Sequence, residues 1–399
     1  MPSSTSREPR RAIVIGAGLA GAAACVYLAR RGWHIDLIDR HSGPAMAASA
    51  LPVGMLSPHV TRSPTPLSRL TALGVPLTRQ ELEAGVQQGR GWQACEVDNL
   101  GADEGRWPAA LVRPAALVQA WLDETGQRTR LDCHWSRTVA SITRHEAANG
   151  GPCWRVADAQ GRTLAEAPAV VLASALGSLA LVAATGHRCD RHDLPLHPVK
   201  GQLSLAALEG PALAPRPRRD QGVYVPSYED EGLQPCWPGR LWAMGSTYER
   251  GQDDRNLTEE AHQRNAASLH RLAPAAADRL RADLLAGRLL GWSEVRCASL
   301  DRLPLVGSCP DLQAFHADAL QMPRRGRMPS LSEVPRMSGL YLLCALGSRG
   351  LSLSALCGQL LAAQMDNDRL PGMPDDLVAA LDPARFAWRR ARRQPARPG

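Results

Sequence analysis

Residues 12–21 read Ala-Ile-Val-Ile-Gly-Ala-Gly-Leu-Ala-Gly, an apolar run that passes directly into glycines with the spacing GxGxxG. The β-branched run predicts a strand, and the Ala- and Leu-rich residues 20–31 predict a helix. Between them, Gly16 permits a tight turn, Gly18 lets backbone N–H groups approach a pyrophosphate, and Gly21 lets the helix pack closely. The stretch therefore predicts the first strand, turn and helix of a nucleotide-binding βαβ unit.

An acidic residue, Asp39, stands at the end of this βαβ unit. Trp33 to Asp39 predicts the second strand, and Asp39 at its end is placed to accept hydrogen bonds from a ribose diol. The carboxylate disfavours NADP because it would repel a 2′-phosphate, but it leaves NAD and FAD open. Two features favour FAD: the small-residue loop from Arg40 to Pro66 and a second glycine turn near the C-terminus. A flavin must be reached by segments that are remote in sequence.

The C-terminal region repeats the same order of elements. Residues 340–344 predict an apolar strand, Gly347-Ser-Arg-Gly350 a turn, and residues 353–365 a helix. Residues 169–173 predict another strand, of the fully apolar kind found inside parallel sheets. A dinucleotide-binding domain assembled from both ends of the chain explains these matching patterns.

The middle of the chain has a different character. Residues 194–248 predict short strands broken by Pro and Gly, typical of an antiparallel sheet, and residues 257–286 predict helix. We therefore expect an α/β protein with a Rossmann-like FAD-binding domain of the glutathione-reductase type and a second, mainly antiparallel-sheet substrate domain. The expected ranges are 12–75, 130–193 and 292–385 for the first domain, 76–129 and 194–291 for the second, and 386–399 for a solvated basic tail.

Composition narrows the class of protein. The 399 residues carry a formal net charge of +7, which is compatible with an anionic partner such as nucleic acid. The ten cysteines contain no CxxC pair and no cluster with histidine, so we expect buried free thiols, no disulfide and no metal site. No apolar stretch resembles a signal peptide or a membrane span, so we expect a cytoplasmic protein with no membrane partner.

Several segments spread through nearly the whole chain resemble one family of flavoproteins. They are residues 12–21, Pro44-Ala-Met-Ala-Ala-Ser49, Leu67-Ser-Arg69, Pro198-Val-Lys-Gly-Gln202, Gly245-Ser-Thr-Tyr-Glu249, Val295-Arg-Cys-Ala-Ser-Leu-Asp-Arg-Leu-Pro-Leu-Val-Gly307 and Gly339-Leu-Tyr-Leu-Leu-Cys-Ala-Leu-Gly-Ser-Arg-Gly350. Together they are similar to the D-amino-acid oxidase/glycine oxidase (DAO) superfamily. Within it, the chain resembles the FAD-dependent C-terminal domain of the bifunctional tRNA 5-methylaminomethyl-2-thiouridine biosynthesis family, MnmC.

The resemblance implies an FAD-dependent oxidoreductase that acts on a CH–NH donor at the wobble uridine of tRNA. Hydride passes from the glycine-derived CH₂ of 5-carboxymethylaminomethyl-uridine to flavin N5, and hydrolysis of the imine gives glyoxylate and 5-aminomethyl-uridine. The family's methyltransferase domain does not precede the flavin unit in this sequence, so we expect a separate methyltransferase to act downstream. Residues Ala50 to Gly54 replace the family's usual Gly-Asn and Gln-Gly in a loop expected beside the flavin.

The resemblance also assigns residues to the expected site. Arg296 is expected to clamp the substrate carboxylate, and Arg349 to share that role or to neutralise the reduced flavin. Tyr224, Tyr248 and Lys200 are further candidates for the substrate pocket, although each also fits a structural role. The expected cofactor-binding residues are Gly16, Ala17, Gly18, Leu19, Ala20, Gly21, Asp39, Arg40, Ala48, Ser49, Val139, Gly347, Ser348, Arg349, Gly350, Leu351 and Ser352.

Two other functions stay open at this point. One is a free glycine, sarcosine or D-amino-acid oxidase or dehydrogenase of the same fold, which activity on small amines without RNA would reveal. The other is a non-catalytic tRNA-binding flavoprotein, motivated by the altered loop Ala50 to Gly54 and the basic residues 389–393. A purified protein that is colourless and does not bind FAD would favour the second.

Overall fold

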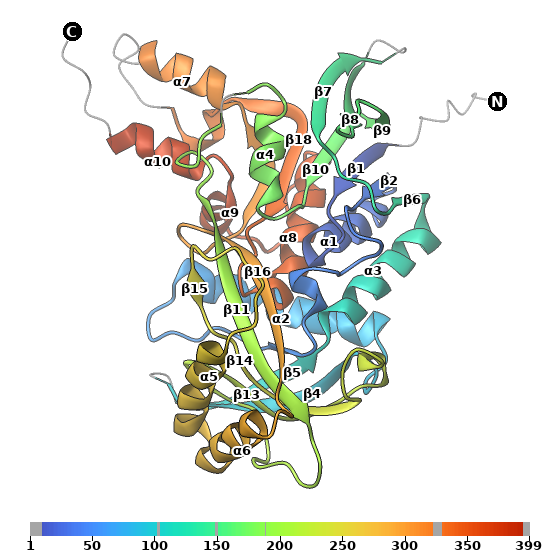
Figure 1. Ribbon diagram of the computed structural model, residues 1–399. Coiled ribbons are helices and arrows are strands. Elements are labelled where there is room, and N and C mark those ends of the chain that lie inside the picture. The colour runs from blue at the N-terminus through green and yellow to red at the C-terminus, as the bar shows by residue number, and fades with distance from the viewer. Residues whose placement is uncertain (1–9, 102–103, 148–150, 188, 322–328, 394–399) are drawn as a thin grey trace.

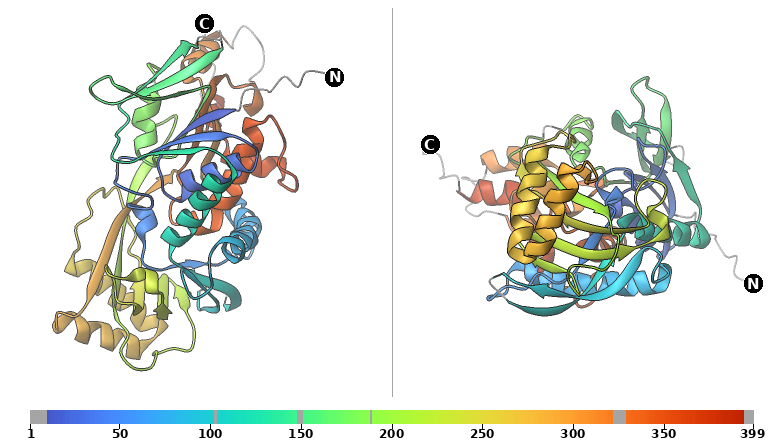
Figure 2. Two further views of the ribbon diagram at one scale, coloured as in Figure 1. Left: turned by 90° about the vertical axis from the view of Figure 1, so that its right-hand side faces the viewer. Right: turned by 60° about the horizontal axis from the view of Figure 1, so that its bottom comes forward.

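Three β-sheets organise the chain (Figure 1). The computed structural model describes residues 10–101, 104–147, 151–187, 189–321 and 329–393. The sheets contain six, nine and three strands. Figure 2 shows the nine-stranded sheet at one end of an elongated molecule, with α5 (Glu259–Leu272) and α6 (Pro274–Leu285) packed beside it, and the other two sheets toward the opposite end.

The six-stranded sheet confirms the expected parallel nucleotide-binding fold. Its order is β17-β18-β10-β1-β2-β6, and all neighbours are parallel except β17 and β18. The strands are β1 (Arg11–Ile15), β2 (His34–Ile38), β6 (Leu131–His134), β10 (Ala169–Leu172), β17 (Leu305–Pro310) and β18 (Arg336–Cys344). Only β10 separates β1 from β18, so the two ends of the chain meet in one sheet as expected.

Strand β1 contributes to two cores, because successive strand residues point to opposite faces of a sheet. Ala12 and Val14 pack among helices, whereas Ile13 and Ile15 face the small sheet and α4. The helices are α1 (Leu19–Ala29), α2 (Pro66–Gly85), α3 (Pro114–Arg128) and α8 (Gly350–Met365); the elements opposite are β7 (Ser141–Glu146), β8 (Pro152–Ala157), β9 (Thr163–Ala167) and α4 (Gly177–Ala183). Cover on both faces explains why the central strands are uniformly apolar.

The nine-stranded sheet confirms the mainly antiparallel second sheet. Its order is β15-β11-β14-β13-β12-β4-β5-β3, and β16 pairs with β11. The strands are β3 (Gly54–Leu56), β4 (Trp92–Asn99), β5 (Gly105–Val112), β11 (Leu196–Ala207), β12 (Arg218–Asp220), β13 (Gly222–Glu229), β14 (Arg240–Gly245), β15 (Glu249–Arg250) and β16 (Leu290–Ser299). The helix expected over residues 257–286 is divided into α5 and α6, because Pro274 opens a new first turn.

Some elements cross the expected domain boundaries. β3 lies in the nine-stranded sheet, although its residues fall in the range expected for the FAD-binding domain. β16 lies there too, because it pairs with β11 along its whole length, from Leu290 opposite Leu205 to Ser299 opposite Leu196. Conversely, α3 packs on α1 in the core of the six-stranded sheet. The division into two domains therefore remains a proposal, with β11 and β16 running between them.

Residues 386–393 were expected in a solvated basic tail, but they are helical and only Arg389, Arg392 and Arg393 among them are exposed. They belong to α10 (Arg385–Arg393), which follows α7 (Leu312–Gln321) and α9 (Asp375–Leu381) and buries Phe386. Arg390 Nη2 lies 2.6 Å from a carboxylate oxygen of Asp193. Apolar residues between the arginines give the helix a face to bury, which a count of charges overlooks. Residues 394–399 lie outside the described residues.

The helices were compared with the length and hydropathy of a membrane span. Within the part of the chain that the structure describes, none combines the length and the hydropathy needed to cross a bilayer.

Candidate active site

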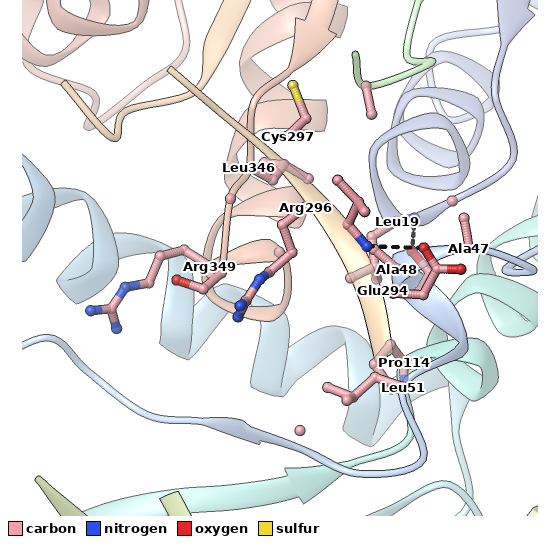
Figure 3. Close-up of a pocket in the computed structure, with 18 of the residues that line it drawn as sticks. Leu19, Ala47, Ala48, Leu51, Pro114, Glu294, Arg296, Cys297, Leu346 and Arg349 are labelled. Atoms are coloured by element: carbon pink, nitrogen blue, oxygen red, sulfur yellow. Dashed lines mark hydrogen bonds between the residues drawn. The ribbon is translucent and has the colours of Figure 1, made fainter. Parts of the chain in front are cut away.

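A large cavity lies between the six-stranded and the nine-stranded sheets (Figure 3). Its volume is about 1330 Å³, which exceeds the roughly 300–1,000 Å³ of common small-molecule pockets. Residues 15–20 and 344–352 line it from the first sheet, and β12, β14 and β16 line it from the second. A cavity of this size and origin has room for a dinucleotide and for part of a second molecule.

The turn between β1 and α1 is packed so closely that two of its glycines leave no space for a side chain. Gly16 has φ +110°, and a Cβ there would lie 2.6 Å from the Ala173 carbonyl oxygen. A Cβ at Gly21 would lie 1.7 Å from the Gly16 carbonyl oxygen. Leu19 N donates a hydrogen bond to the Ser49 hydroxyl at 3.0 Å, which ties the turn to the following loop.

Two helices begin at this cavity, α1 and α8. The N-cap residues, Gly18 and Arg349, make no side-chain capping hydrogen bond, and neither first turn contains an acidic residue. Helix N-termini of this kind present N–H groups and a partial positive charge, which favour a bound anion. The cavity therefore favours a bound anion at two places, the N-termini of α1 and α8.

Asp39 follows β2 and lines the same cavity. Its carboxylate accepts hydrogen bonds from Ala17 N at 2.7 Å and from His41 N at 2.8 Å, and it lies 2.9 Å from His41 Nδ1. A carboxylate offers about four lone-pair positions, so it can still accept from a ribose hydroxyl. Asp39 thus holds the glycine turn against β2 and remains able to bind a nucleotide.

The structure brings the residues expected to bind the cofactor together. All of them line the cavity except Gly21, which packs against the Gly16 carbonyl instead. The lining residues are Gly16, Ala17, Gly18, Leu19, Ala20, Asp39, Arg40, Ala48, Ser49, Val139, Gly347, Ser348, Arg349, Gly350, Leu351 and Ser352. These residues come from three distant parts of the sequence.

Arg296, on β16, brings a guanidinium group to the cavity (Figure 3). Nη1 donates to the Ser246 hydroxyl and Nη2 to the Thr247 carbonyl, both at 2.9 Å. The guanidinium carbon lies 5.6 Å from the centre of the Tyr248 ring. Burial lowers the pKa of Arg296, an effect that Tyr248 opposes, and no carboxylate of the described residues pairs with it. Arg296 is a braced cation suited to a carboxylate ligand.

Arg219 and Arg349 also line the cavity. Arg349 Nη2 lies 3.2 Å from His59 Nδ1. Arg219, which sequence analysis missed, donates to the Ser57 hydroxyl at 2.6 Å and to Asn99 Oδ1 at 3.0 Å. Its partners lie 162 and 120 residues away along the chain, so no local pattern marks it. Together with Arg296, these residues bring three guanidinium groups to the cavity lining.

Tyr248 lines the cavity, but the structure does not bring Tyr224 and Lys200 to it. Tyr224 is buried under α5 and α6, where burial raises its pKa to about 12. Lys200 is buried as well, and its Nζ lies 2.6 Å from Asp254 Oδ1. Both side chains thus have structural partners in place of a ligand.

All ten cysteines are free, but not all are buried as expected, because Cys133 and Cys236 are exposed. Cys297 lines the cavity, and burial raises its pKa to about 12. Its thiol is therefore protonated near neutral pH.

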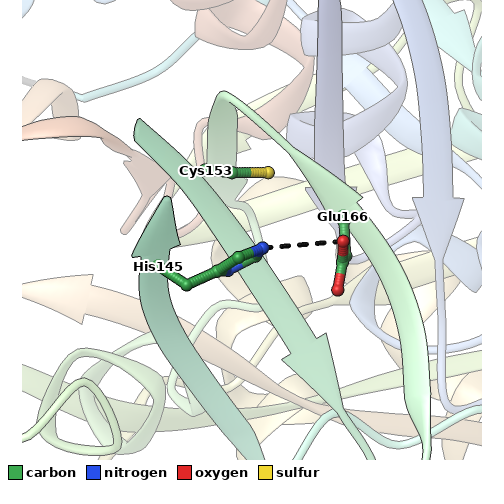
Figure 4. A group of neighbouring side chains, drawn as sticks. All are labelled: His145, Cys153 and Glu166. Atoms are coloured by element: carbon green, nitrogen blue, oxygen red, sulfur yellow. Dashed lines mark ion pairs between the residues drawn. The ribbon is translucent and has the colours of Figure 1, made fainter. Parts of the chain in front are cut away.

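The described residues contain one group with metal-ligand chemistry, His145, Cys153 and Glu166 (Figure 4). Their ligand atoms lie within 4.8 Å of one another. However, Glu166 is paired with Arg155 at 2.5 Å, and burial raises the pKa of the Cys153 thiol. Metal ligation requires a deprotonated thiol and an available carboxylate, so this group supports no metal assignment.

Comparison with known proteins identifies a family. The chain matches the family model described as FAD dependent oxidoreductase (DAO) over residues 11–111 and 104–364. It is 34% identical to the tRNA 5-methylaminomethyl-2-thiouridine biosynthesis bifunctional protein MnmC of Verminephrobacter eiseniae, over 96% of this chain and 65% of that protein. It is 36% identical to the protein of the same name from Delftia acidovorans, over 96% of this chain and 62% of that protein. The chain thus spans slightly less than two thirds of these curated relatives.

Solved structures show the same fold. Glycine oxidase from Geobacillus kaustophilus matches with a TM-score of 0.65 and 19% identity, over 94% of this chain and 99% of that chain. L-Proline dehydrogenase from P. horikoshii matches with a TM-score of 0.66 and 14% identity, over 95% of this chain and 98% of that chain. These likenesses confirm the expected fold of the DAO type.

The cavity fits FAD, the cofactor in the description of the matching family. The glycine turn and the uncapped start of α1 suit a pyrophosphate, and Asp39 suits a ribose. The uncapped start of α8 offers positive charge at a second place, where an electron-rich ring system would be stabilised. No acidic residue in either first turn opposes this binding.

Proposed function

The chain belongs to the family of FAD-dependent oxidoreductases, and we propose that it removes the carboxymethyl group from 5-carboxymethylaminomethyl-(2-thio)uridine at the wobble position of tRNA. The products are 5-aminomethyl-(2-thio)uridine and glyoxylate. When bound, FAD accepts two electrons and two hydrogens from the substrate's CH₂–NH group. One water then adds to the resulting imine carbon, and the C–N bond breaks with the nitrogen leaving as the amine. Each turnover therefore consumes one FAD and one water, and it forms one glyoxylate, one amine and one reduced FAD.

The observation that carries this proposal is the guanidinium of Arg296, which lies in the cavity without a carboxylate partner among the described residues. A carboxylate on the substrate would supply the missing negative charge and could accept a hydrogen bond from Nη1, because the Nε and Nη2 hydrogens already go to the carbonyls of Val199, Lys200 and Thr247. In Figure 3, Arg296 lies between Leu19 and Ala48 on one side and the Arg349 guanidinium on the other. A glycine unit held there would lie beside the region that fits FAD.

The relatives support tRNA as the substrate. Their name refers to biosynthesis of a modified uridine of tRNA, and the identity of 34% and 36% extends over 96% of this chain. The net charge of +7 is compatible with a polyanionic partner. We propose that a separate methyltransferase acts downstream and that the reaction takes place in the cytoplasm.

Positioning carries the chemistry in this proposal. Arg296 fixes the carboxylate, and the Tyr248 ring packs beside it, so the CH₂ between carboxylate and amine has one orientation. FAD would be held by cavity-lining residues, namely the glycine turn at residues 16–20, Asp39, Arg40, Ala48, Ser49, Val139 and residues 347–352. The protonated Cys297 thiol contributes no charge to this site.

Mass analysis of tRNA nucleosides tests the proposal. Modified tRNA incubated with the purified flavoprotein should lose 5-carboxymethylaminomethyl-uridine and gain 5-aminomethyl-uridine, with one glyoxylate released per conversion. Unchanged tRNA together with turnover of free glycine or sarcosine would show the free amino-acid oxidase instead, since Arg296 fits that carboxylate too. A colourless protein that neither binds FAD nor turns over any amine would leave only the non-catalytic alternative.

A further inference from the structure

Arg219 and Arg349 supply two guanidinium groups that the carboxylate clamp does not use. We propose that they form a second anion site, which binds a backbone phosphate of the tRNA next to the nucleotide that is oxidised. The inference rests on the proposed function, because it names where the same nucleic acid substrate is held.

Arg219 is braced as a binding group. Its Nε donates to Asn99 Oδ1 at 3.0 Å, and its Nη1 donates to the Ser57 hydroxyl at 2.6 Å and to the Pro58 carbonyl at 2.9 Å. Among the described residues, none accepts a hydrogen bond from Nη2. Three neutral acceptors thus fix the plane of the guanidinium and leave one edge for a ligand, which lowers the entropy lost on binding.

Arg349 is held by the same short segment of chain. Its Nη2 lies 3.2 Å from His59 Nδ1, two residues after the Ser57 that holds Arg219. No acceptor within the described ranges lies at its Nε or Nη1. Figure 3 shows its side chain extending away from Leu19 and Ala48, past the position of Arg296. Its guanidinium is therefore directed to the side of the cavity opposite the glycine turn.

Residues 57–59 hold both guanidinium groups in one part of the cavity, where their positive charges repel each other. Burial, and then the charge of Arg349, lower the pKa of Arg219. Asp220 is the neighbouring acid in the lining, but no carboxylate of the described residues forms an ion pair with either arginine. Two like charges that share a half-buried site without a counter-ion favour a ligand with negative charge and several acceptor oxygens.

A phosphate of the nucleic acid meets these requirements. Its two free oxygens can accept from two arginines at once, and backbone phosphates take a large share of protein contacts to nucleic acids. A uridine whose glycine unit reaches Arg296 brings its own 5′ and 3′ phosphates with it. The second site would therefore favour a nucleotide over a free amino acid, even though both present a carboxylate to Arg296.

Comparison of two synthetic substrates tests the inference. One is the 5-carboxymethylaminomethyl-uridine nucleoside, and the other is the same nucleoside with 5′ and 3′ phosphates. In the wild-type holoenzyme, kcat/KM for the phosphorylated substrate should exceed that for the nucleoside by about tenfold or more, as expected for charge-assisted hydrogen bonds. Arg219→Gln should reduce this ratio about tenfold.

Arg218→Gln is the matched control, because Arg218 is the neighbour on β12 whose Nη1 donates to the Leu272 carbonyl away from the cavity. It should keep the wild-type ratio. With whole tRNA, Arg219→Gln should raise KM more than it changes kcat and reduce the slope of log KM against log salt by about one.

A second variant keeps the test decisive if Arg219→Gln loses its flavin. Asn99→Asp retains an acceptor for Arg219 Nε but places a negative charge beside the guanidinium. It should therefore reduce the preference for the phosphorylated substrate about as much as Arg219→Gln does. A ratio that both variants leave unchanged, or equal losses with both substrates, would overturn the second anion site while the proposed function stands. If the wild-type enzyme converts neither substrate nor tRNA, the proposed function itself fails.

Discussion

The two sides of the cavity are built in different ways. The nucleotide side is made by backbone: the turn at residues 16–21 and the uncapped starts of α1 and α8. The substrate side is made by side chains, Arg219, Arg296 and Arg349, which come from strands and turns that are distant in sequence. A backbone site tolerates no added volume, whereas a side-chain site changes its ligand with one substitution. We therefore expect a single substitution to change the choice of substrate more readily than the choice of cofactor.

The contrast extends to how each side is held. The glycine turn is fixed through its backbone: the Gly16 carbonyl packs against Gly21, and Ala17 N and Leu19 N donate to the Asp39 and Ser49 side chains. Arg296 instead depends on acceptors that follow β14, and Arg219 on a loop before α2. Substitutions on the two sides should consequently separate flavin binding from turnover.

The largest expected effect is on the nucleotide side. Gly21→Val places a side chain 1.7 Å or less from the Gly16 carbonyl oxygen, so α1 must move and FAD binding should be abolished. The flavin absorbance of the purified protein measures this. Gly126→Ala in α3, where a Cβ meets nothing within 4 Å, should remain yellow. A yellow Gly21→Val protein with normal FAD content would refute a backbone-built site.

Next comes Arg296→Gln on the substrate side. It should keep the flavin spectrum but lower kcat/KM about 100-fold, equivalent to roughly 2.7 kcal/mol, because a buried carboxylate loses its charged partner. Steady-state kinetics with modified tRNA measure it, and Arg240→Gln at an exposed position of β14 serves as control. Retention of full activity would mean that Arg296 has only a structural role.

The connection between the two sheets provides a third prediction. Asp301 follows β16, and its carboxylate binds Arg385 of α10 at 2.8 and 3.0 Å. Arg385 is 1% exposed. Asp301→Asn should lower the free energy of unfolding by about 3 kcal/mol, because it leaves a buried cation unpaired. Urea unfolding measures this. Asp132→Asn, at an exposed ion pair with Arg130, should cost less than about 1 kcal/mol.

The same pair has a defined pH dependence. Burial alone would raise the pKa of Asp301, but the hydrogen bonds and charge of Arg385 hold it below the ordinary 3.8. Its contribution to stability is therefore present above the unfolded-state pKa, and it is lost as the pH falls through the lower folded-state pKa. The difference in stability between wild type and Asp301→Asn should shrink below about pH 4. A constant difference down to pH 2 would contradict the pairing.

The smallest effect is expected for Lys200→Gln. Lys200 pairs with Asp254 outside the cavity, so flavin content should stay the same and kcat/KM should change by less than about threefold. The measurement is again steady-state turnover of modified tRNA. A loss of tenfold or more with FAD retained would place Lys200 in the catalytic machinery after all.

Local sequence was sufficient for the nucleotide side. A strand, three glycines and an acid lie within 28 residues, from Ala12 to Asp39, and each of these features acts mainly through its own backbone and nearest neighbours. The same holds for β18 and α8, whose apolar run and glycine turn predict a strand and a helix from short-range pattern alone. Such features are readable because their energetics are local.

Local sequence was not sufficient for the other elements. The charge run at residues 389–393 suggested a solvated tail, but Phe386 anchors it as a helix. Lys200 stands in a segment that resembles the family, yet its side chain pairs with Asp254, and Tyr224 is buried in the core with residues of α5 and α6. Arg219 was missed because nothing near it in sequence accepts its hydrogen bonds.

The sequence by itself indicated a dinucleotide site, and the motifs that it shares with one family indicated FAD and led us to expect a carboxylate clamp at Arg296. Only the tertiary structure decided which charged groups share the cavity with that clamp. The physical reason is the range of the interactions. Glycine turns and helix starts follow from residues a few positions apart, whereas the guanidinium groups of Arg219 and Arg349 meet through one loop, residues 57–59. The separation along the chain between Arg349 and His59 is 290 residues.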